Sequence, residues 1–577
     1  MLEQSRYWER KTKKTPIMLL FMFAVISLTT IGYFLFLKPS EEMIPYFSEE
    51  NPIFYQGDMI GLTLRSGDEY YISIALLDEY FPDLLFFDEK SGSYIVATNA
   101  DVIQIIPDET SFWINGSLEK VQNPPLFRKE EEVFLSLDWL KNYYPIQYNK
   151  IDANGIWIFA HGDEDFTGII QDKKGSIHNY RLRSSQSLKS PYYAEVTPGE
   201  KVYIEDETED FYLVRKENGI GGYIKKKLIS NTDKGIVQIP APREVPLEKE
   251  APSPIHLTWE AVYSVNPDPK KLPDMPGVNV VSPTWFHLLD ESGNLNNLAS
   301  KEYSNWAKER GYQVWGLFSN NFDPELTHLA LKNYETRQKI ITQLIDFAKE
   351  YHLDGINFDI ENVNLEDAPY VTQLMKEATP LLHRHNLIVS MDITFISDSE
   401  NWSMFYEREK LAEVVDYLIV MAYDQHTNGS GVAGSVSSLP WVENNLLRLL
   451  EEVPNYKLVL GIPFYTRLWE EKLDENGNKT ISSKALTMNQ AKEWIDEHKL
   501  EPVYDPESEQ NYVEMTDDDG TVYKMWLEDA TSMKKRAEIA RSYNLAGIAG
   551  WSRYFANDDA WVFLHDFYIN ASEKIDS

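Results

Sequence analysis

Eight short apolar segments between residues 255 and 551 constrain the fold of this chain more than any other feature. Each has the length and the content of branched apolar residues that are typical of a buried strand, and several are separated by helical patterns. Eight such strands alternating with helices over roughly 300 residues predict an α/β fold, a (β/α)8 TIM barrel rather than an open sheet. The segments are IHLTWEAV, VNVVSPTWF, YQVWGLF, GINFDIE, LIVSMDITF, DYLIVMAY, KLVLGIPFY and LAGIAGW.

Polar side chains gather at the carboxyl ends of these segments. In LDGINFDIEN, residues 353–362, Asn357, Asp359 and Glu361 alternate with apolar residues and would therefore point to one face of a strand. On a barrel strand this face is the interior, with Glu361 outermost at the mouth, Asp359 one layer below it and Asn357 lowest. Further polar residues follow other strands, namely Asp392, Tyr423, Asp424, Gln425, His426 and Trp551.

Two neighbouring carboxyl groups in a partly dry site raise each other's pKa. Glu361 can then remain protonated near neutral pH and act as a general acid. A single inward-facing acid is often only a structural group of the barrel interior. Three polar residues at a spacing of two, beside a second polar strand end, favour the catalytic interpretation.

The segment DGINFDIE resembles the D-G-x-[DN]-x-D-x-E signature of glycoside hydrolase family 18. SPTWF at 282, MAYD at 421, GIPFYTRLW at 461 and the tryptophan of the last strand, Trp551, are similar to other features of the family. The resemblance covers residues 256–570, including an insertion at about 466–540 that we expect to form an α+β wall of a cleft. It is closest to the branch that contains peptidoglycan N-acetylglucosaminidases.

The resemblance implies retaining, substrate-assisted hydrolysis of β-linked N-acetylglucosamine polymers. Glu361 would protonate the glycosidic oxygen, Asp359 would orient the acetamido group that attacks the anomeric carbon, and Tyr423 would bind the acetamido carbonyl. The reaction requires no metal and no organic cofactor. The residues predicted to bind substrate are Asn357, Met421, Asp424, Trp551, Asp392, Tyr465 and Trp285.

Asn357 departs from the family pattern, because many family members carry aspartate at this position. An asparagine adds no negative charge beside Asp359. We therefore expect Asp359 to stay ionised rather than to share a proton with a deeper carboxyl group.

The N-terminus contains an uncharged run of 21 residues at 17–37, preceded by five basic residues and followed by glutamates. This pattern predicts a membrane-spanning helix with residues 1–16 in the cytoplasm and the rest of the chain outside a bacterial cell. A cleaved signal peptide is the alternative.

Two small modules and a linker are predicted between this run and the barrel. Residues 51–160 resemble the N-terminal domain of copper amine oxidases, through SFWINGSLEKVQNPPLF and EEVFLSLDWLKN, but contain no cluster of copper ligands. Residues 166–231 resemble bacterial SH3-like domains, through LRSS, GEKV and GGYI, which implies either a binding module for cell-wall peptides or a spacer. Residues 232–255 are proline-rich and predict a semi-rigid linker.

Composition excludes several other functions. The chain has 91 acidic and 55 basic residues, a net charge of −36, which argues against a nucleic-acid partner. It has no cysteine, so it contains neither disulfides nor thiolate metal sites. The expected partner is peptidoglycan or another N-acetylglucosamine-containing glycan, with membrane contact through the N-terminal helix. The alternatives are a non-catalytic protein that binds cell-wall glycans, and the same chemistry on chitin or soluble glycans.

Overall fold

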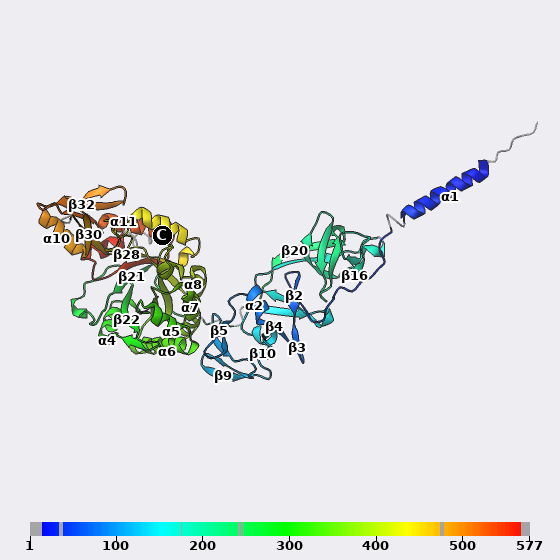
Figure 1. Cartoon of the computed structure of the whole chain (residues 1–577), viewed down its shortest axis with the longest axis horizontal. Coiled ribbons are helices and arrows are strands. Elements are labelled where there is room, and N and C mark those ends of the chain that lie inside the picture. Colours follow the sequence, from blue (N-terminus) through cyan, green and yellow to red (C-terminus); the bar gives the residue numbers. More distant parts are fainter. Residues whose placement is uncertain are drawn as a thin grey trace, which may run out of the picture. The chain divides into compact units, whose positions relative to one another are not determined.

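A computed structural model describes residues 14–33, 38–174, 176–240, 243, 245, 247–473 and 478–566. The chain forms two compact units, and Figure 1 labels their elements. The first unit comprises Met1–Pro82 and Pro124–Pro242, and the second comprises Asp83–Asn123 and Arg243–Ser577. All the residues predicted to act in catalysis belong to the second unit.

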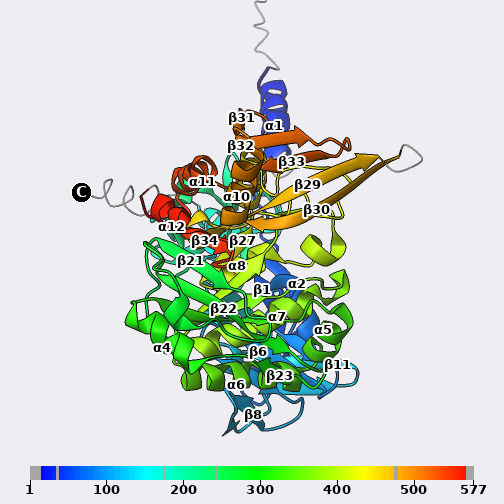
Figure 2. The same ribbon diagram turned by 90° about the vertical axis from the view of Figure 1, so that its left-hand side faces the viewer.

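Eight parallel strands of the second unit close into a barrel, which confirms the predicted fold (Figure 2). Each of the eight apolar segments forms one strand. The sheet closes because the first strand pairs in parallel with both the second strand and the last. The strands, in chain order, are β21 (Ile255–Glu260), β22 (Val280–Leu288), β24 (Gln313–Ser319), β25 (Gly355–Asp359), β26 (Ile388–Ile393), β27 (Tyr417–Met421), β28 (Leu458–Pro463) and β34 (Gly547–Trp551).

The strands are buried on both faces, as their continuous apolar sequences predict. Leu257, Trp315, Ile419 and Val459 belong to one apolar cluster, while a larger cluster joins the strands to the surrounding helices. The apolar stripe of α6 is buried in that larger cluster. The helices are α4 (Lys301–Glu309), α5 (Pro324–Leu331), α6 (Tyr334–Tyr351), α7 (Ala368–His383), α8 (Arg408–Val414), α9 (Leu439–Leu449), α11 (Ala530–Ser542) and α12 (Asp558–Leu564).

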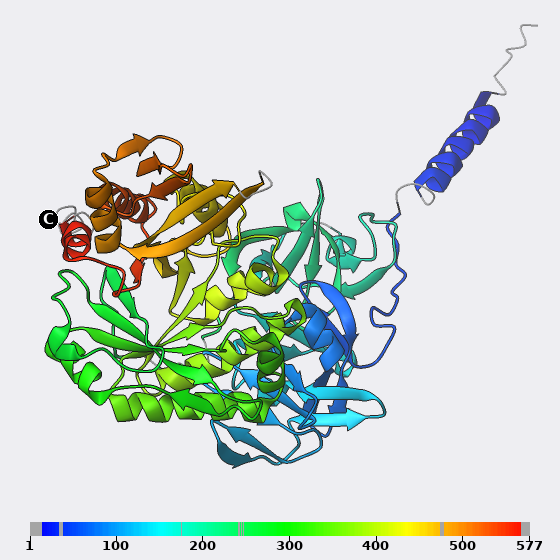
Figure 3. The ribbon, with the colours of Figure 1, turned by 60° about the vertical axis from the view of Figure 1, so that its left-hand side comes forward.

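A five-stranded antiparallel sheet with one helix lies between β28 and β34, where the insertion is predicted. Its long hairpin, β29 (Tyr465–Leu473) and β30 (Lys479–Thr487), extends away from the barrel in Figures 2 and 3. The first residue of this hairpin, Tyr465, lies two positions after the end of β28, so the insertion starts at the mouth of the barrel. The other elements are α10 (Met488–His498), β31 (Val503–Asp505), β32 (Gln510–Thr516) and β33 (Val522–Trp526).

A second antiparallel sheet, within residues 83–123, belongs to the same unit as the barrel. Asp88 Oδ2 accepts a hydrogen bond of 2.5 Å from the amide of Tyr334 at the start of α6. Asp101 pairs with Arg384, which follows α7, at 2.7 Å. The range 51–160, predicted as one module, is therefore divided between the two units. The strands are β5 (Phe86–Asp88), β6 (Ser93–Ala97), β7 (Val102–Ile105), β8 (Ser111–Ile114) and β9 (Ser117–Lys120).

Besides α1 (Lys14–Gly32), the described residues of the first unit form three sheets and two short α-helices, α2 (Ile74–Tyr80) and α3 (Leu137–Leu140). One sheet has the order β12-β13-β1-β2 and another the order β10-β11-β4-β3. These strands are β1 (Pro52–Tyr55), β2 (Asp58–Leu62), β3 (Leu64–Ser66), β4 (Glu69–Ser73), β10 (Leu126–Lys129), β11 (Glu132–Ser136), β12 (Ile146–Lys150) and β13 (Ile156–Ala160).

The third sheet has seven strands and contains the range predicted to be SH3-like. The relationship of this sheet to SH3-like domains, and of the preceding module to amine oxidases, stays a prediction. Its strands are β14 (Glu164–Ile170), β15 (Arg181–Arg183), β16 (Tyr192–Glu195), β17 (Lys201–Glu207), β18 (Phe211–Arg215), β19 (Gly221–Lys225) and β20 (Ile229–Ile236).

The linker predicted at 232–255 is ordered at both ends. Strand β20 continues to Ile236, and Lys249 donates a hydrogen bond of 2.6 Å to Asp354, which precedes β25. Leu247 and Ala251 pack against one apolar cluster of the barrel. These contacts attach the C-terminal part of the predicted linker to the barrel. The residues of this range that lie outside the described residues are Ala241, Pro242, Glu244 and Pro246.

Helix α1 spans Lys14–Gly32, so it begins three residues before the apolar run at 17–37 and overlaps most of it. In the described part of the chain, no helix has both the length and the apolar character needed to cross a bilayer. The membrane span predicted at 17–37 is therefore not supported by these residues, and positions 34–37 lie outside them.

Candidate active site

Three carboxyl groups meet at the mouth of the barrel. Asp359 ends β25 and lies in register with Asp392 of the neighbouring strand β26. Asp359 is 8% exposed and Asp392 is 2% exposed, whereas Glu361, two residues beyond the end of β25, is partly accessible. The layering predicted from the alternating sequence is thus present, with Glu361 nearest the solvent.

Glu361 has the protonation behaviour expected of a general acid. Burial raises its pKa well above the usual value, and the negative charges of Asp359 and Asp424 raise it further, together with a polar interaction with Asp359. A carboxyl group with a raised pKa holds its proton near neutral pH and can deliver it to a leaving group.

The sequence predicts that Asp359 stays ionised, because its deeper neighbour Asn357 carries no charge. The structure contradicts this prediction. Burial raises the pKa of Asp359 well above its usual value, and the charge of Asp392 raises it further. One carboxylate oxygen of each aspartate, Oδ1, is buried and has no hydrogen-bond partner among the described residues. Two such groups are costly to ionise together, because the charge of one opposes the ionisation of the other. Asp392 therefore supplies the carboxyl partner of Asp359.

Asn357 lies beneath this pair and interacts with Asp392. Burial raises the pKa of Asp392 well above its usual value, and the nearby amide of Asn357 lowers it in part, although Asn357 Nδ2 makes no regular hydrogen bond among the described residues. On its other side Asn357 Oδ1 accepts a hydrogen bond of 3.4 Å from Ser282 of β22. Asn357 is fully buried, so it supports the carboxyl pair from below and does not contact substrate.

Two tyrosines and an aspartate lie beside the carboxyl groups, after β27 and β28. Tyr465 Oη donates a hydrogen bond of 2.5 Å to Asp424 Oδ1, and its ring lies edge-on to Tyr423 at 6.4 Å. Burial and then the charge of Asp392 raise the pKa of Tyr423 well above its usual value, so its hydroxyl remains a donor. Met421 is the last residue of β27, two positions before Tyr423, and it is partly exposed. The structure therefore brings Tyr423, Asp424 and Tyr465 together, and the roles of these residues and of Met421 toward a substrate stay predictions.

A cavity of about 460 Å³ opens beside Asp359 and Trp551. Its wall is formed by the carboxyl ends of β22 and β24, including His287, and by residues that follow β21 and β24, including Tyr263 and Phe322. Within the described part of the chain, no lysine or arginine lines it. Trp551, at the end of β34, packs on Trp259 with the ring centres 5.8 Å apart and remains partly exposed. The cavity is therefore suited to a neutral ring such as a sugar.

Trp285, predicted to bind substrate, does not lie in this site. It is fully buried, its Nε1 donates a hydrogen bond of 2.7 Å to Asn266, and its ring packs against Tyr303 of α4. The strand register shifts between Thr284 and Phe286, and Thr284 lines the cavity instead. The tryptophan of SPTWF thus belongs to the layer between the barrel and its helices.

Asn320, which the sequence pattern did not indicate, fixes the backbone of Glu361. Its Nδ2 donates a hydrogen bond of 2.7 Å to the Glu361 carbonyl, and its Oδ1 accepts one of 3.1 Å from the Glu361 amide. Thr327 accepts a further hydrogen bond of 2.9 Å from Nδ2, which orients the amide. The only sequence signal was a run of polar residues after β24, SNN at 319–321.

We expect Asn320→Ala to lower kcat by about tenfold and to change KM by less than about twofold, because a small displacement of Glu361 weakens proton transfer more than binding. Steady-state kinetics on a chitooligosaccharide would measure both constants. Asn305→Ala, an exposed change on α4, is the matched control. Equal losses in the two variants, or a change in KM alone, would contradict a positioning role.

Comparison with protein families identifies the domain. Residues 307–556 match the model described as glycosyl hydrolases family 18. The barrel is a family 18 glycosidase domain. The match begins in α4 and includes β34, and the structure shows that β21 and β22, which precede the matched region, complete the same barrel. The prediction that the chain is a glycosidase is confirmed.

Several curated relatives of the family 18 domain are bacterial. An uncharacterized glycosylase, YvbX of Bacillus subtilis (strain 168), is 25% identical over 293 residues, which cover 49% of this chain and 83% of the relative. The cortical fragment-lytic enzyme of the same organism is 24% identical over 256 residues, covering 44% of this chain and 58% of the relative. Di-N-acetylchitobiase of Homo sapiens is 25% identical over 244 residues, covering 37% and 62%.

Solved structures share the fold. The spore cortex-lytic enzyme SleL of Bacillus megaterium QM B1551 aligns with a TM-score of 0.50 and 18% identity, over 66% of this chain and 79% of that one. This similarity supports the family 18 fold and, at such low identity, nothing more specific.

Proposed function

We propose that this protein hydrolyses β-linked N-acetylglucosamine polymers, with peptidoglycan as its substrate, by a retaining, substrate-assisted mechanism. The observation that carries the proposal is the arrangement of Glu361, Asp359 and Asp392. It combines an acid that holds its proton with a carboxyl pair that carries one negative charge beside it.

In the first step Glu361 gives its proton to the glycosidic oxygen as the bond to the anomeric carbon breaks. The acetamido oxygen of the same sugar forms a bond to that carbon from the opposite face, which produces an oxazolinium ion. Asp359 accepts a hydrogen bond from the acetamido N–H, and the proton of the pair then resides on Asp392. The negative charge therefore lies next to the positive charge that develops.

In the second step Glu361, now ionised, removes a proton from water as the water oxygen attacks the anomeric carbon. The oxazolinium ring opens, configuration is retained, and Glu361 regains its proton. Tyr423 donates a hydrogen bond to the acetamido oxygen, and Trp551 stacks on the sugar ring at the floor of the site. Asp424, held by Tyr465, contacts a hydroxyl of the same sugar.

Peptidoglycan is favoured over chitin by one observation and one prediction. A relative of this domain is named a cortical fragment-lytic enzyme. The resemblance predicted for the modules before the barrel, which stays a prediction, would agree with a cell-surface protein. Another relative is a di-N-acetylchitobiase, which supports soluble chitin fragments as the second candidate substrate. A non-catalytic role in binding wall glycans is the third candidate, and the presence of Glu361 with its neighbours argues against it.

Purified peptidoglycan and chitooligosaccharides, each incubated with the protein, distinguish these candidates. The expected result is release of new reducing ends that carry N-acetylglucosamine from peptidoglycan, at a rate above that from the chitin fragments. Faster release from the chitin fragments would overturn the choice of substrate. No release from either, with binding retained, would favour the non-catalytic alternative.

We also propose that the barrel acts outside the cytoplasm. Basic residues followed by an apolar run are also typical of a cleaved signal peptide, and this pattern supports export of the barrel. Fractionation of cells that express the full chain, followed by protease treatment of intact protoplasts, would test it. Protection of the barrel from the protease would contradict the proposal.

The pH dependence of kcat should be bell-shaped, with both limbs displaced upward. The rate falls on the alkaline side as Glu361 loses its proton, and on the acid side as the Asp359–Asp392 pair binds a second proton. Both limbs lie above the ordinary carboxyl range, since the pKa values of all three groups are raised.

Asn357→Asp adds a third carboxyl group beneath the pair and should move the acid limb upward by about one pH unit. Rates measured from pH 4 to 9 for the wild type, for Asn357→Asp and for the exposed control Asn305→Asp would show this shift. An acid limb that coincides in all three proteins would contradict the coupling of this position to the pair.

A further inference from the structure

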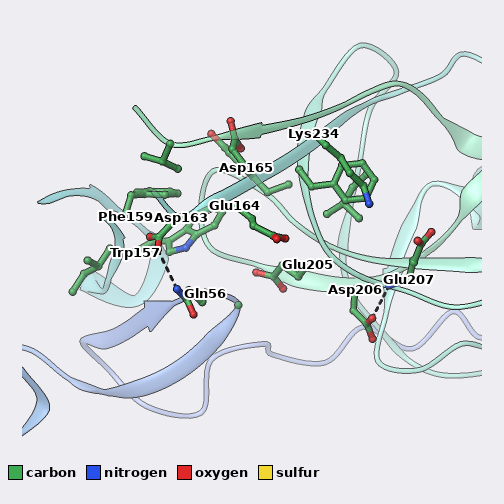
Figure 4. Close-up of a pocket in the computed structure, with 16 residues that line it drawn as sticks. Gln56, Trp157, Phe159, Asp163, Glu164, Asp165, Glu205, Asp206, Glu207 and Lys234 are labelled. Atoms are coloured by element: carbon green, nitrogen blue, oxygen red, sulfur yellow. Dashed lines mark hydrogen bonds between the residues drawn. The ribbon is translucent and has the colours of Figure 1, made fainter. Parts of the chain in front are cut away.

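A second cavity, of about 420 Å³, lies within the first unit. Figure 4 shows the residues that line it, which come from the sheet of β1 and β13 and from strands β14, β17 and β20 of the seven-stranded sheet. This cavity is formed where two modules of the same unit meet. It is separate from the family 18 site, which belongs to the other unit.

One wall of this junction cavity is aromatic. The rings of Trp157 and Phe159 lie 4.6 Å apart, and Tyr203 meets Trp157 edge-on at 4.8 Å. Phe166 adds a fourth ring from β14. Aromatic faces attract cations through their quadrupole, most strongly where the site is partly shielded from water.

Six carboxylates also line the cavity, and most of them form no ion pair in the described part of the chain. Of the six carboxylates that line the cavity, only Glu205, with Arg215, and Glu207, with Lys226, form ion pairs. In the described part of the chain, Glu164, Asp165 and Asp206 pair with no lysine or arginine. Figure 4 shows Glu164 and Glu205 extending toward one another. The potential in the cavity therefore favours a cation.

The cavity already receives an ammonium group of the chain itself. Lys234 Nζ lies 4.5 Å from the centre of the Phe166 ring. Lys234 is also the one basic side chain among the described residues that line the cavity. The rings and carboxylates are thus arranged as an ammonium group requires, and Lys234 shows how such a group is accommodated.

An organic cation fits this geometry better than a metal ion. The described residues contain no group of three or more histidine, aspartate or glutamate side chains that could hold one metal ion. A cavity of this size with an aromatic wall has room for an aliphatic chain as well as for a charge. We propose that the junction cavity binds a primary ammonium group on an aliphatic chain, such as the side chain of a lysine residue in a peptide.

Calorimetric titration of the full chain at low ionic strength with N-acetyl-lysine amide would test the proposal. We expect saturable binding of this probe. N-acetyl-norleucine amide, which has the same aliphatic chain without the ammonium group, should show none. Magnesium chloride is the comparison for a metal ion, and it should not bind in this cavity. It should weaken binding of the lysine probe no more than another salt of equal ionic strength does.

Variants of the lining give the sharpest prediction. Asp165→Asn together with Asp206→Asn should weaken binding of the lysine probe by about tenfold, because two uncompensated charges are lost. Lys234→Met should strengthen binding by about threefold, since it removes the internal ammonium group that competes for the same rings. Asp172→Asn and Lys227→Met, exposed changes in the same unit outside the cavity, are the matched controls for charge.

Four results would overturn the proposal. These are no saturable binding of the lysine probe, equal binding of the norleucine probe, equal effects of the lining and control variants, and weaker binding in Lys234→Met. Binding of magnesium that depends on Asp165 and Asp206 would identify a metal site instead. The measurement requires no catalysis, so its outcome is independent of the proposed glycosidase substrate.

Discussion

Glu361→Gln is expected to lower kcat by about 10² to 10⁴-fold while KM changes by less than about threefold. Glutamine keeps the size and the polar character of the side chain but has no proton to give to the leaving oxygen. The Asn320 contacts to the backbone of residue 361 do not involve its side chain, so the loop should keep its conformation. Reducing ends released from peptidoglycan and from chitooligosaccharides would measure the loss.

The control for this substitution is Glu366→Gln, an exposed change five residues later in the chain. It should retain the wild-type rate. Equal release of wall fragments by the wild type and Glu361→Gln would remove Glu361 from the mechanism. A loss confined to KM would assign it to substrate binding alone.

Asp392→Asn should lower kcat by at least about tenfold and, at the same time, stabilise the folded barrel above neutral pH. The loss of rate follows because asparagine cannot take the proton from Asp359 when the oxazolinium charge develops. The gain in stability follows from the buried pair, whose pKa values are raised in the folded state.

The sign of the stability effect depends on pH. A carboxyl group with a raised pKa binds its proton more tightly in the folded chain than in the unfolded chain. The group therefore contributes favourably to the free energy of unfolding below its pKa in the unfolded chain, about 3.9. This contribution is lost as the pH rises through its raised pKa in the folded chain. The melting temperature of Asp392→Asn, relative to the wild type, should be unchanged near pH 4 and increased by a few degrees near pH 8.

Thermal unfolding of the barrel at these two pH values, followed by calorimetry, would test this prediction. Asp398→Asn, an exposed change after the same strand, is the control and should show no such pH dependence. A melting temperature lowered at pH 8, or raised equally at both pH values, would show that ionisation of the pair does not destabilise the folded barrel.

The strands of the barrel were predictable because each carries its own signal, a short run of branched apolar residues that needs no knowledge of its neighbours. The layering of Glu361 above Asp359 was predictable for the same reason, since it follows from the period of a single strand. The pairing of Asp359 with Asp392 was not, because it depends on the register between two strands. The sequence predicts both as site residues, Asp359 for catalysis and Asp392 for substrate binding, but it does not predict that they form a pair.

Two other differences have local causes. A register shift in β22 turns Trp285 away from the cavity, and the alternation of the sequence contains no sign of that shift. Asn320 acts on the backbone of another loop, 41 residues later in the chain, so its residue type alone did not distinguish it from other polar loop residues.

The sheet formed within residues 83–123 sets an order of events during synthesis of the chain. Its contacts with the barrel are made by residues that leave the ribosome much later, since Asp88 and its partner Tyr334 are 246 positions apart. At a synthesis rate of about 20 residues per second, this delay is roughly 12 s. During that time Ile95 and Val102 lack the apolar cover that Tyr334 and Leu381 later provide. We therefore expect the nascent sheet to be a target for chaperones until α6 and α7 have emerged.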